Sequence, residues 1–314
     1  MSTSANDRAL ATSAGTLHFR NPIVLAAGTA AYGRELADVV AFRALGGIVT
    51  KAVSTHPRAG APAPRVAEFD GGMINAIGLA NPGVDAVRAD HLPWLASAIP
   101  GTRVIVNVVG FAAEDFAEVV AGLEDSPGID AFELNVSCPN VKAGGLEFGA
   151  DPVALRLLVT RARAATARPI FVKLSAAFPD LVGSAVAAVD AGADALSLVN
   201  TLPGLVIDVE RRQPVLGFGS GGVSGASILP IGVLATHRVH RALPNTPLLG
   251  VGGVATTTDA IQYVLAGASL VGVGTAAMQD PRVPERLVDG LSRWCSDHRV
   301  GSMTELIGAL EYPA

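Results

Sequence analysis

Eight short apolar runs, rich in β-branched residues, alternate along the whole chain with segments of helical periodicity. Such alternation predicts a parallel sheet, because consecutive parallel strands need a crossover connection that is usually a helix. Eight strand–helix units without a break in composition predict a single α/β domain, a (β/α)8 TIM barrel, with a doubly wound open sheet as the alternative. The predicted strands are residues 23–26, 47–50, 104–108, 132–136, 170–174, 195–199, 248–251 and 270–273.

The composition agrees with one large buried sheet. Half of the 314 residues are hydrophobic and only 16% are charged, which suits parallel strands covered by helices. Residues 14–314 are predicted to form the barrel domain. Residues 1–13 are small and polar and lack the apolar core of a signal peptide, so we expect a flexible N-terminal tail on a cytoplasmic protein. The richest apolar stretch, residues 181–207, is interrupted by Asp190 and Asp194, which argues against a membrane span.

Charge and cysteine content exclude several classes of protein. The net charge is −5 and the basic residues are scattered, which argues against nucleic-acid binding. The two cysteines, Cys138 and Cys295, lie far apart in the sequence and fit a reduced protein better than a disulfide framework. Two cysteines are also too few to ligate an iron–sulfur cluster or a structural zinc ion within this chain. The six histidines show no metal-ligand spacing, so no metal site is predicted.

Three connections are longer or richer in glycine than simple turns. They are residues 52–84, 200–225 and 137–150, and each follows a predicted strand. Long connections in a compact domain are usually functional, and in a barrel those that follow strands project from the carboxyl face. We therefore expect these connections to overhang one mouth of the barrel, where barrel enzymes place their active sites.

Cys138 follows the fourth predicted strand, and Pro139 restricts the residue before it to an extended conformation. A lone cysteine is most often a small buried hydrophobe. Here Asn135 and Asn140 flank the thiol with amide donors and acceptors that suit a planar, polar substrate. The pattern predicts that Cys138 is a reactive group.

Other polar residues lie at predicted strand ends where core packing does not need them. Lys51 follows the second strand, Asn107 ends the third, and Asn200 and Thr201 follow the sixth. Lys173 lies inside an apolar run, and a buried lysine is rare without an anionic partner. That partner is either a structural carboxylate or a cofactor whose developing negative charge the ammonium group stabilises.

Glycine-rich segments follow the last two predicted strands, at residues 250–254 and 273–276. Glycine lets the backbone approach a phosphate closely, and free N–H groups at a helix start favour an anion. Either segment alone is weak evidence, but the loops after strands seven and eight form the usual phosphate site of a barrel. A third segment, residues 219–225, precedes another helix and adds possible donors.

With these residues identified, the chain resembles the class 1 dihydroorotate dehydrogenases, most closely the catalytic subunit of the NAD-linked subclass 1B. The resemblance covers nearly the full length, and many ordered matches make it specific. The matching segments are residues 21–23, 49–51, 64–66, 75–79, 81–83, 133–142, 172–175, 200–202, 221–225 and 273–276.

The resemblance implies an FMN-containing barrel that oxidises dihydroorotate to orotate in de novo pyrimidine (UMP) biosynthesis. It assigns to Cys138 the removal of the C5 proton while hydride leaves C6 for flavin N5. The implied substrate contacts are Lys51, Asn75, Ala76, Ile77, Gly78, Leu79, Asn135, Asn140, Asn200 and Thr201. The implied FMN contacts are Ala27, Gly28, Lys51, Asn107, Asn135, Lys173, Val199, Gly225, Gly252, Gly253, Gly274 and Thr275.

The resemblance also implies partners. Subclass 1B enzymes pass electrons to NAD through a second subunit that carries FAD and an iron–sulfur cluster, and a homodimer of the catalytic chain is expected. Ala27 stands where the family usually has serine. The electron acceptor therefore stays open between NAD, fumarate and a quinone. The alternatives to the dihydroorotate reaction are a flavoprotein like dihydropyrimidine dehydrogenase, acting on uracil or thymine, and a non-catalytic barrel subunit.

Overall fold

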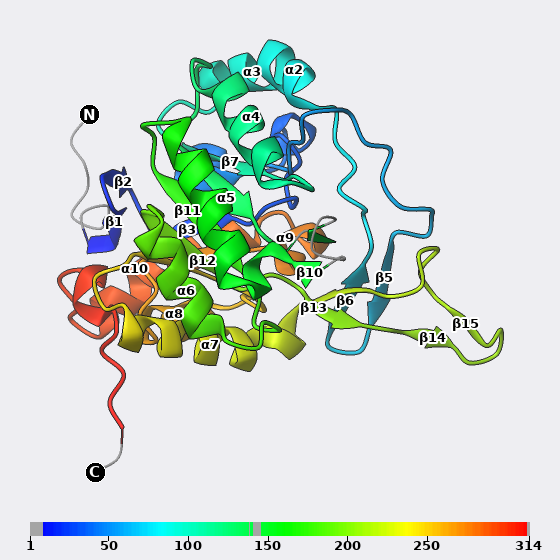
Figure 1. Ribbon diagram of the computed structural model, residues 1–314. Helices are drawn as coiled ribbons and strands as arrows, with labels where there is room; N and C mark the ends of the chain where they lie inside the picture. The colour runs from blue at the N-terminus through cyan, green and yellow to red at the C-terminus, as the bar shows by residue number, and fades with distance from the viewer. Residues whose placement is uncertain (1–8, 138, 141–145, 313–314) are drawn as a thin grey trace.

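The centre of the computed structural model, which describes residues 9–137, 139–140 and 146–312, is a closed barrel of parallel strands (Figure 1). The strands follow one another around the barrel in chain order, and the last one pairs with the first. They are β3 (Ile23–Leu25), β4 (Gly47–Val49), β7 (Arg103–Val108), β8 (Ala131–Asn135), β11 (Ile170–Leu174), β12 (Ala195–Leu198), β17 (Leu248–Val251) and β18 (Leu270–Val273). Each lies within one residue of its predicted bounds. The predicted TIM barrel is confirmed, and the open-sheet alternative is wrong.

Helices cover the outside of the barrel, as the sequence periodicity predicts. In α4 (Ala113–Leu123), Phe116, Val119, Val120 and Leu123 are all buried on the barrel side. The first crossover, between β3 and β4, contains only the short turns η1 (Arg34–Leu36) and η2 (Phe42–Ala44). In the described part of the chain, no helix combines the length and the apolar character needed to cross a membrane. The covering helices are α3 (Leu92–Ala98), α4 (Ala113–Leu123), α5 (Pro152–Ala164), α6 (Leu181–Asp190), α7 (Leu229–Ala242), α8 (Thr257–Leu265) and α10 (Val283–Asp297).

An apolar layer fills the amino end of the barrel interior. Because side chains alternate between the two faces of a strand, every barrel strand places one apolar residue inside at this level. Below this layer, the antiparallel hairpin of β1 (Thr12–Ala14) and β2 (Leu17–Phe19) adds Ala14 and Phe19 to the same cluster. The strand residues are Val24, Val49, Ile105, Ala131, Phe171, Ala195, Leu249 and Leu270.

That hairpin corrects the predicted boundary of the N-terminal tail. Residues 1–13 were expected to be a flexible tail, but Leu10 is buried and Thr12 donates from Oγ1 to the carbonyl of Ser269 at 3.1 Å. The reason is that the hairpin closes the amino end of the barrel and buries apolar side chains there. Residues 1–8 lie outside the described part of the chain.

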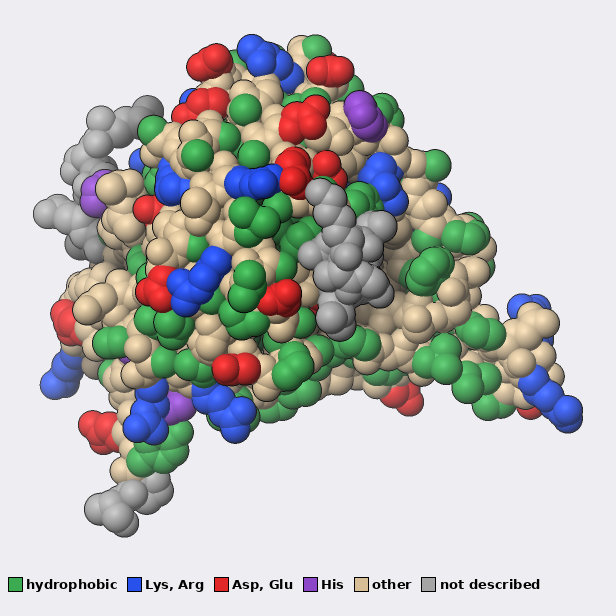
Figure 2. All heavy atoms as spheres, viewed as in Figure 1, with side chains coloured by type: hydrophobic (Ala, Val, Ile, Leu, Met, Phe, Trp, Pro, Cys, Tyr) green, Lys and Arg blue, Asp and Glu red, His purple; other side chains and the backbone are tan. Residues whose placement is uncertain are grey.

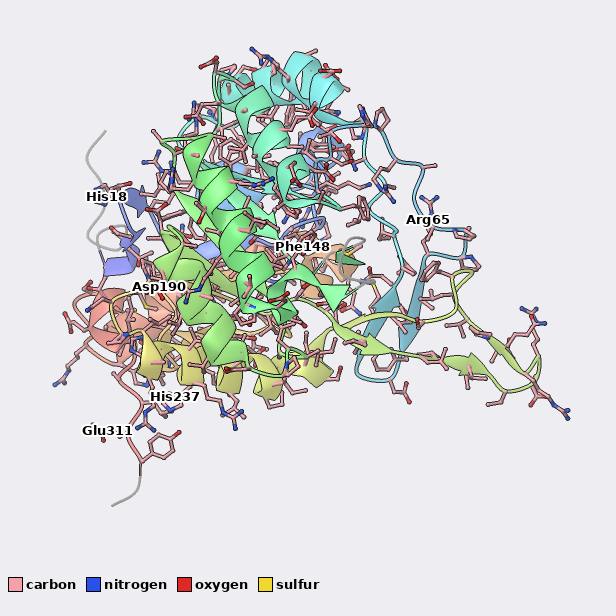
Figure 3. The ribbon with its side chains drawn as sticks, viewed as in Figure 1. His18, Arg65, Phe148, Asp190, His237 and Glu311 are labelled. Carbon is pink, nitrogen blue, oxygen red and sulfur yellow. The ribbon has the colours of Figure 1, made fainter. Side chains whose placement is uncertain are left out.

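The two longest connections form a shared sheet at the carboxyl end of the barrel. The connection after β4 supplies β5 (Val66–Phe69) and β6 (Gly72–Asn75), and the one after β12 supplies β13 (Leu202–Gly204) and β16 (Gly221–Ser224). Their order is β13-β16-β6-β5, with every pair antiparallel. In Figure 3, His18 of the β1–β2 hairpin and Arg65 beside β5 lie at opposite sides of the molecule, which marks the amino and carboxyl ends.

An arm projects from this sheet between β13 and β16. It contains the short strands β14 (Ile207–Asp208) and β15 (Gln213–Pro214) and extends beyond the body of the molecule (Figures 1 and 2). Several of its apolar side chains are exposed, namely Leu205, Ile207, Val209 and Phe218. The connection after β8 contains a small ladder of β9 (Pro139–Asn140) and β10 (Leu146–Glu147).

Candidate active site

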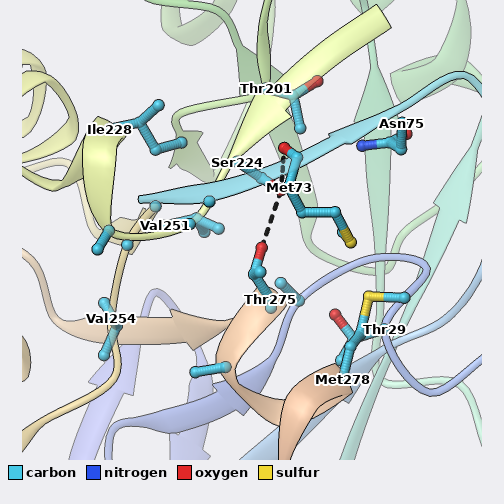
Figure 4. A pocket seen from close by; sticks show the side chains of 18 of the residues that line it. Thr29, Met73, Asn75, Thr201, Ser224, Ile228, Val251, Val254, Thr275 and Met278 are labelled. Atoms are coloured by element: carbon cyan, nitrogen blue, oxygen red, sulfur yellow. Dashed lines mark hydrogen bonds between the residues drawn. The ribbon is translucent and has the colours of Figure 1, made fainter. Parts of the chain in front are cut away.

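A cavity of about 460 Å³ opens at the carboxyl end of the barrel, between the strand ends and the sheet of the two long connections (Figure 4). The wall combines residues that lie far apart in the sequence, as expected for the active-site end of a barrel. It includes most of the predicted site residues, namely Ala27, Gly28, Asn75, Ile77, Lys173, Val199, Asn200, Thr201, Gly225, Gly252, Gly253, Gly274 and Thr275.

The remaining predicted site residues do not line the cavity within the described part of the chain. Asn107 is buried inside the barrel, where it donates to Glu133, and Asn135 accepts from Nδ2 of the lining residue Asn200 at 3.1 Å. Cys138 lies outside the described residues, as do the side-chain positions around it, including that of Asn140. The other predicted site residues that do not line the cavity are Lys51, Ala76, Gly78 and Leu79. Lys51 lies just after β4 and is partly buried.

Glycines after β17 bring bare backbone to one side of the cavity. Gly252 and Gly253 have φ angles of 131° and 75°, which favour glycine over residues with a side chain. A Cβ atom on Gly253 would lie 2.7 Å from Cβ of Leu229, the first residue of α7. These glycines therefore provide the backbone surface that a phosphate group requires.

Tyr263 of α8 supports this glycine turn from behind. Its hydroxyl donates to the carbonyl oxygen of Gly252 at 2.8 Å, and its side chain is fully buried. Burial raises the pKa of Tyr263 well above its usual value, and the nearby charge of Asp259 raises it further, so the hydroxyl remains a donor. The ring fits because Gly250 and Gly232 face it, where a Cβ atom would lie 2.3 Å or less from Tyr263 atoms.

A second polar contact joins two other elements across the cavity. Thr275, the first residue of α9 (Thr275–Gln279), donates from Oγ1 to Oγ of Ser224 in β16 at 2.8 Å (Figure 4). Both hydroxyls line the cavity beside Gly225. The contact therefore connects the barrel end after β18 to the sheet of the long connections.

Lys173 lines the cavity and has no partner within the described part of the chain. It lies in β11 and is 8% exposed, and it makes no hydrogen bond or ion pair with any residue that the structure describes. The interior carboxylate of Glu133, on neighbouring β8, instead accepts from Asn107 Nδ2 at 2.6 Å and from Ser197 Oγ at 2.5 Å. The interpretation of Lys173 as half of a structural ion pair is therefore not supported, and its ammonium group is available to an anionic ligand.

Amide groups on the other side of the cavity have fixed orientations. Asn75 donates from Nδ2 to the carbonyl of Gly222 at 3.2 Å, across the β6–β16 pairing. Asn200 donates from Nδ2 to Asn135 and accepts at Oδ1 from the backbone N–H of Thr201 at 2.9 Å. A planar ligand with carbonyl and N–H edges would meet these groups without a large rearrangement.

Several residues of the site were missed by sequence reasoning. Ser224 lies in the glycine-rich segment 219–225, but its hydroxyl was not singled out, and Thr29, Met73 and Met278 carried no motif. Glu133 could have been found, since a charged residue at an inward position of an apolar strand requires partners inside the barrel.

A family model described as dihydroorotate dehydrogenase matches residues 9–294. The catalytic subunit of dihydroorotate dehydrogenase B (NAD(+)) from Pelobacter propionicus is 46% identical over 295 residues, which are 94% of this chain and 96% of that protein. The protein of the same name from Trichlorobacter lovleyi is 43% identical over 303 residues, covering 96% of this chain and 99% of that protein. The one from Cutibacterium acnes is 43% identical over 297 residues, covering 95% and 96%.

Proposed function

Because the chain belongs to the dihydroorotate dehydrogenase family, we propose that it oxidises dihydroorotate to orotate with bound FMN, as a step of de novo pyrimidine biosynthesis. One observation carries the FMN assignment. A buried lysine that has no partner among the described residues and a glycine turn suited to phosphate line the same cavity. A cytoplasmic location stays a prediction from the sequence.

The residues on the cavity wall fit a flavin mononucleotide. The backbone at Gly252, Gly253 and Gly274, together with Thr275, would hold the phosphate, and Lys173 would neutralise negative charge on the ring system. FMN, when bound, supplies an acceptor for the hydride that leaves C6 of the substrate. Val199 and Gly28 would bound the remaining flavin surface.

The substrate would be oriented by the amides of Asn75, Asn135 and Asn200, with further contacts from Thr201 and Lys51. Cys138 would take the C5 proton as general base. An ordinary thiol has a pKa near 8.5, so its effectiveness must come from positioning close to C5 and from exclusion of water. The sequence resemblance implies that Asn140 lies beside Cys138.

We propose two protein partners. The relatives are named as catalytic subunits of an NAD-linked enzyme, and a second subunit with FAD and an iron–sulfur cluster would pass electrons from this chain to NAD. A homodimer is proposed as well, and the exposed apolar side chains of Leu205, Ile207, Val209 and Phe218 on the arm support an interaction surface there (Figure 2).

The test is anaerobic reduction of the purified protein. The protein should be yellow and should bleach when dihydroorotate is added. Cys138→Ala should keep its flavin while flavin reduction slows by about a hundredfold or more, the usual contribution of a general base. Cys295→Ala is the matched control, since the Cys295 thiol is buried against Met303, with Sγ and Sδ 3.2 Å apart. The flavin of this variant should be reduced at the rate of the wild type.

A protein that stays inert after reconstitution with FMN would refute the proposed function. Return of the yellow colour when uracil or thymine is added to the reduced protein, without any bleaching of the oxidised protein by dihydroorotate, would select the dihydropyrimidine reaction instead. Unchanged reduction of Cys138→Ala would show that another group removes the proton.

A further inference from the structure

A buried carboxylate lies directly below the floor of the cavity. Glu133 is on β8 with its side chain inside the barrel, and it is 1% exposed. It does not line the cavity, and its register partner on the next strand, Phe171, belongs to the apolar layer at the amino end. Glu133 therefore sits between the apolar floor of the barrel and the residues proposed to hold the flavin.

The carboxylate joins two strands that do not pair with each other. Oε1 accepts from Nδ2 of Asn107 on β7 at 2.6 Å, and Oε2 accepts from Oγ of Ser197 on β12 at 2.5 Å. Both distances are short for hydrogen bonds to a carboxylate. An ionised carboxylate can only accept, so it requires a donor from each neighbour.

This requirement fixes the amide of Asn107. The amide nitrogen must face Glu133, which directs the amide oxygen away from it. No donor among the described residues hydrogen-bonds to that oxygen. Asn107 is one of the predicted FMN contacts, and its free group is thus an acceptor rather than a donor.

Packing alone does not account for Glu133. Taking a carboxylate out of water is unfavourable even when it is hydrogen-bonded, and an apolar side chain of similar size avoids that cost. Lys173, the cation of the same interior, makes no ion pair with it in the described structure. Glu133 therefore orients Asn107 and Ser197, and the stability of the core does not explain why a carboxylate stands there.

We propose that Glu133 is a positioning residue of the flavin site, which keeps the Asn107 amide turned so that its oxygen accepts an N–H group of the bound flavin. The inference rests on the proposed function, because it assumes that FMN occupies the cavity. Glu133 acts only through Asn107 and does not touch the flavin.

The first test measures FMN affinity of the apoprotein by quenching of flavin fluorescence. In Glu133→Met, binding would force the Asn107 nitrogen against an apolar side chain without an acceptor, so the dissociation constant should rise about tenfold or more. Glu133→Gln should restore binding to within about threefold, because its oxygen can accept from Asn107 while its nitrogen donates to the Ser197 hydroxyl. Ser197→Ala is the matched control, since it removes the other hydrogen bond to the same carboxylate, and it should also bind within about threefold of the wild type.

The second test is a double-mutant cycle, which detects whether two residues act through each other. Asn107→Ala should weaken FMN binding about tenfold, and adding Glu133→Met should cause no further loss. Wild-type affinity in Glu133→Met would overturn the inference, and so would an additive double mutant. If Glu133→Met does not fold, wild-type affinity in Asn107→Ala alone still overturns it. A wild-type protein that binds no FMN would instead refute the proposed function.

Discussion

Replacing Tyr263 by phenylalanine tests whether the glycine turn after β17 holds a phosphate. The substitution removes one hydroxyl and keeps the ring that packs between Gly232 and Gly250. The lost hydrogen bond joins Oη to the carbonyl oxygen of Gly252 at 2.8 Å, in a fully buried position. No other donor in the described structure bonds to that carbonyl, so the variant leaves a buried acceptor unsatisfied.

Two effects of Tyr263→Phe can be estimated. An unsatisfied buried acceptor costs about 1–3 kcal/mol of unfolding free energy. At about 2 °C per kcal/mol for a chain of this size, the melting temperature of the apoprotein should fall by about 2–6 °C. The Gly252–Gly253 peptide also loses its fixed orientation, so FMN should bind less tightly, whereas riboflavin, which lacks the phosphate, should be affected much less.

The assay is therefore a comparison of FMN and riboflavin affinities, with thermal unfolding of each apoprotein. Tyr32→Phe is the matched control, because Tyr32 is also buried and donates from Oη to the carbonyl of Ala52 at 3.0 Å, away from the glycine turn. It should lower the melting temperature by a similar amount and leave the ratio of the two affinities unchanged. Equal weakening of FMN and riboflavin by Tyr263→Phe would refute the reasoning.

Two further predictions concern titratable groups. Burial raises the pKa of the Cys295 thiol, and Glu305 raises it further. Iodoacetamide should therefore modify only Cys138 in the folded protein, and orotate should protect Cys138 from modification. Modification of Cys295 before unfolding, detected by peptide mass spectrometry, would contradict this prediction. Burial lowers the pKa of His240 below 6.5, and His237 lowers it further. His240 therefore stabilises the folded state above pH 6.5. This contribution is lost as the pH falls through the lowered pKa. The melting temperature should therefore decline less between about pH 7.5 and 5 in His240→Phe than in the wild type, and parallel declines would show that His240 is not involved.

The barrel could be predicted because its signal is local. Each strand is a short apolar run bounded by polar residues or glycine, and the alternation with helices leaves few topologies open. The run at residues 248–251 and that at 270–273 form β17 and β18 with the predicted bounds. The tail boundary was wrong because β1 is only three residues long and forms by pairing with β2, which periodicity over so short a segment does not reveal.

The shared sheet of the two long connections could not be predicted in the same way. β6 and β16 are separated by more than a hundred residues, and neither has the apolar alternation of a half-buried strand. Their pairing depends on where the barrel places the ends of β4 and β12. Sequence reasoning therefore placed both connections at the carboxyl face but interpreted them as loops.

Part of the chemistry of the site could be predicted from residue types. Lys173 was predicted to need an anionic partner, and no carboxylate among the described residues pairs with it, since Glu133 bonds to Asn107 and Ser197 instead. That choice depends on which side chains meet inside the barrel, which follows from strand register and not from spacing along the chain. The prediction for Cys138 stays a prediction, since that residue lies outside the described part of the chain.

The shared sheet explains why the substrate side of the cavity needs both long connections. Asn75 on β6 is the register partner of Val66 on one side and of Gly222 on the other, so its amide is held by strands from both connections. A Cβ atom on Gly222 would lie 2.1 Å from Oγ1 of Thr201, which shows how closely the β16 backbone approaches the residues that follow β12. Because hydrogen-bonded strands hold a common register, the orientations of Asn75 and Thr201 are set together. Neither connection alone could fix these groups, and short loops at the two strand ends would not reach each other to do so.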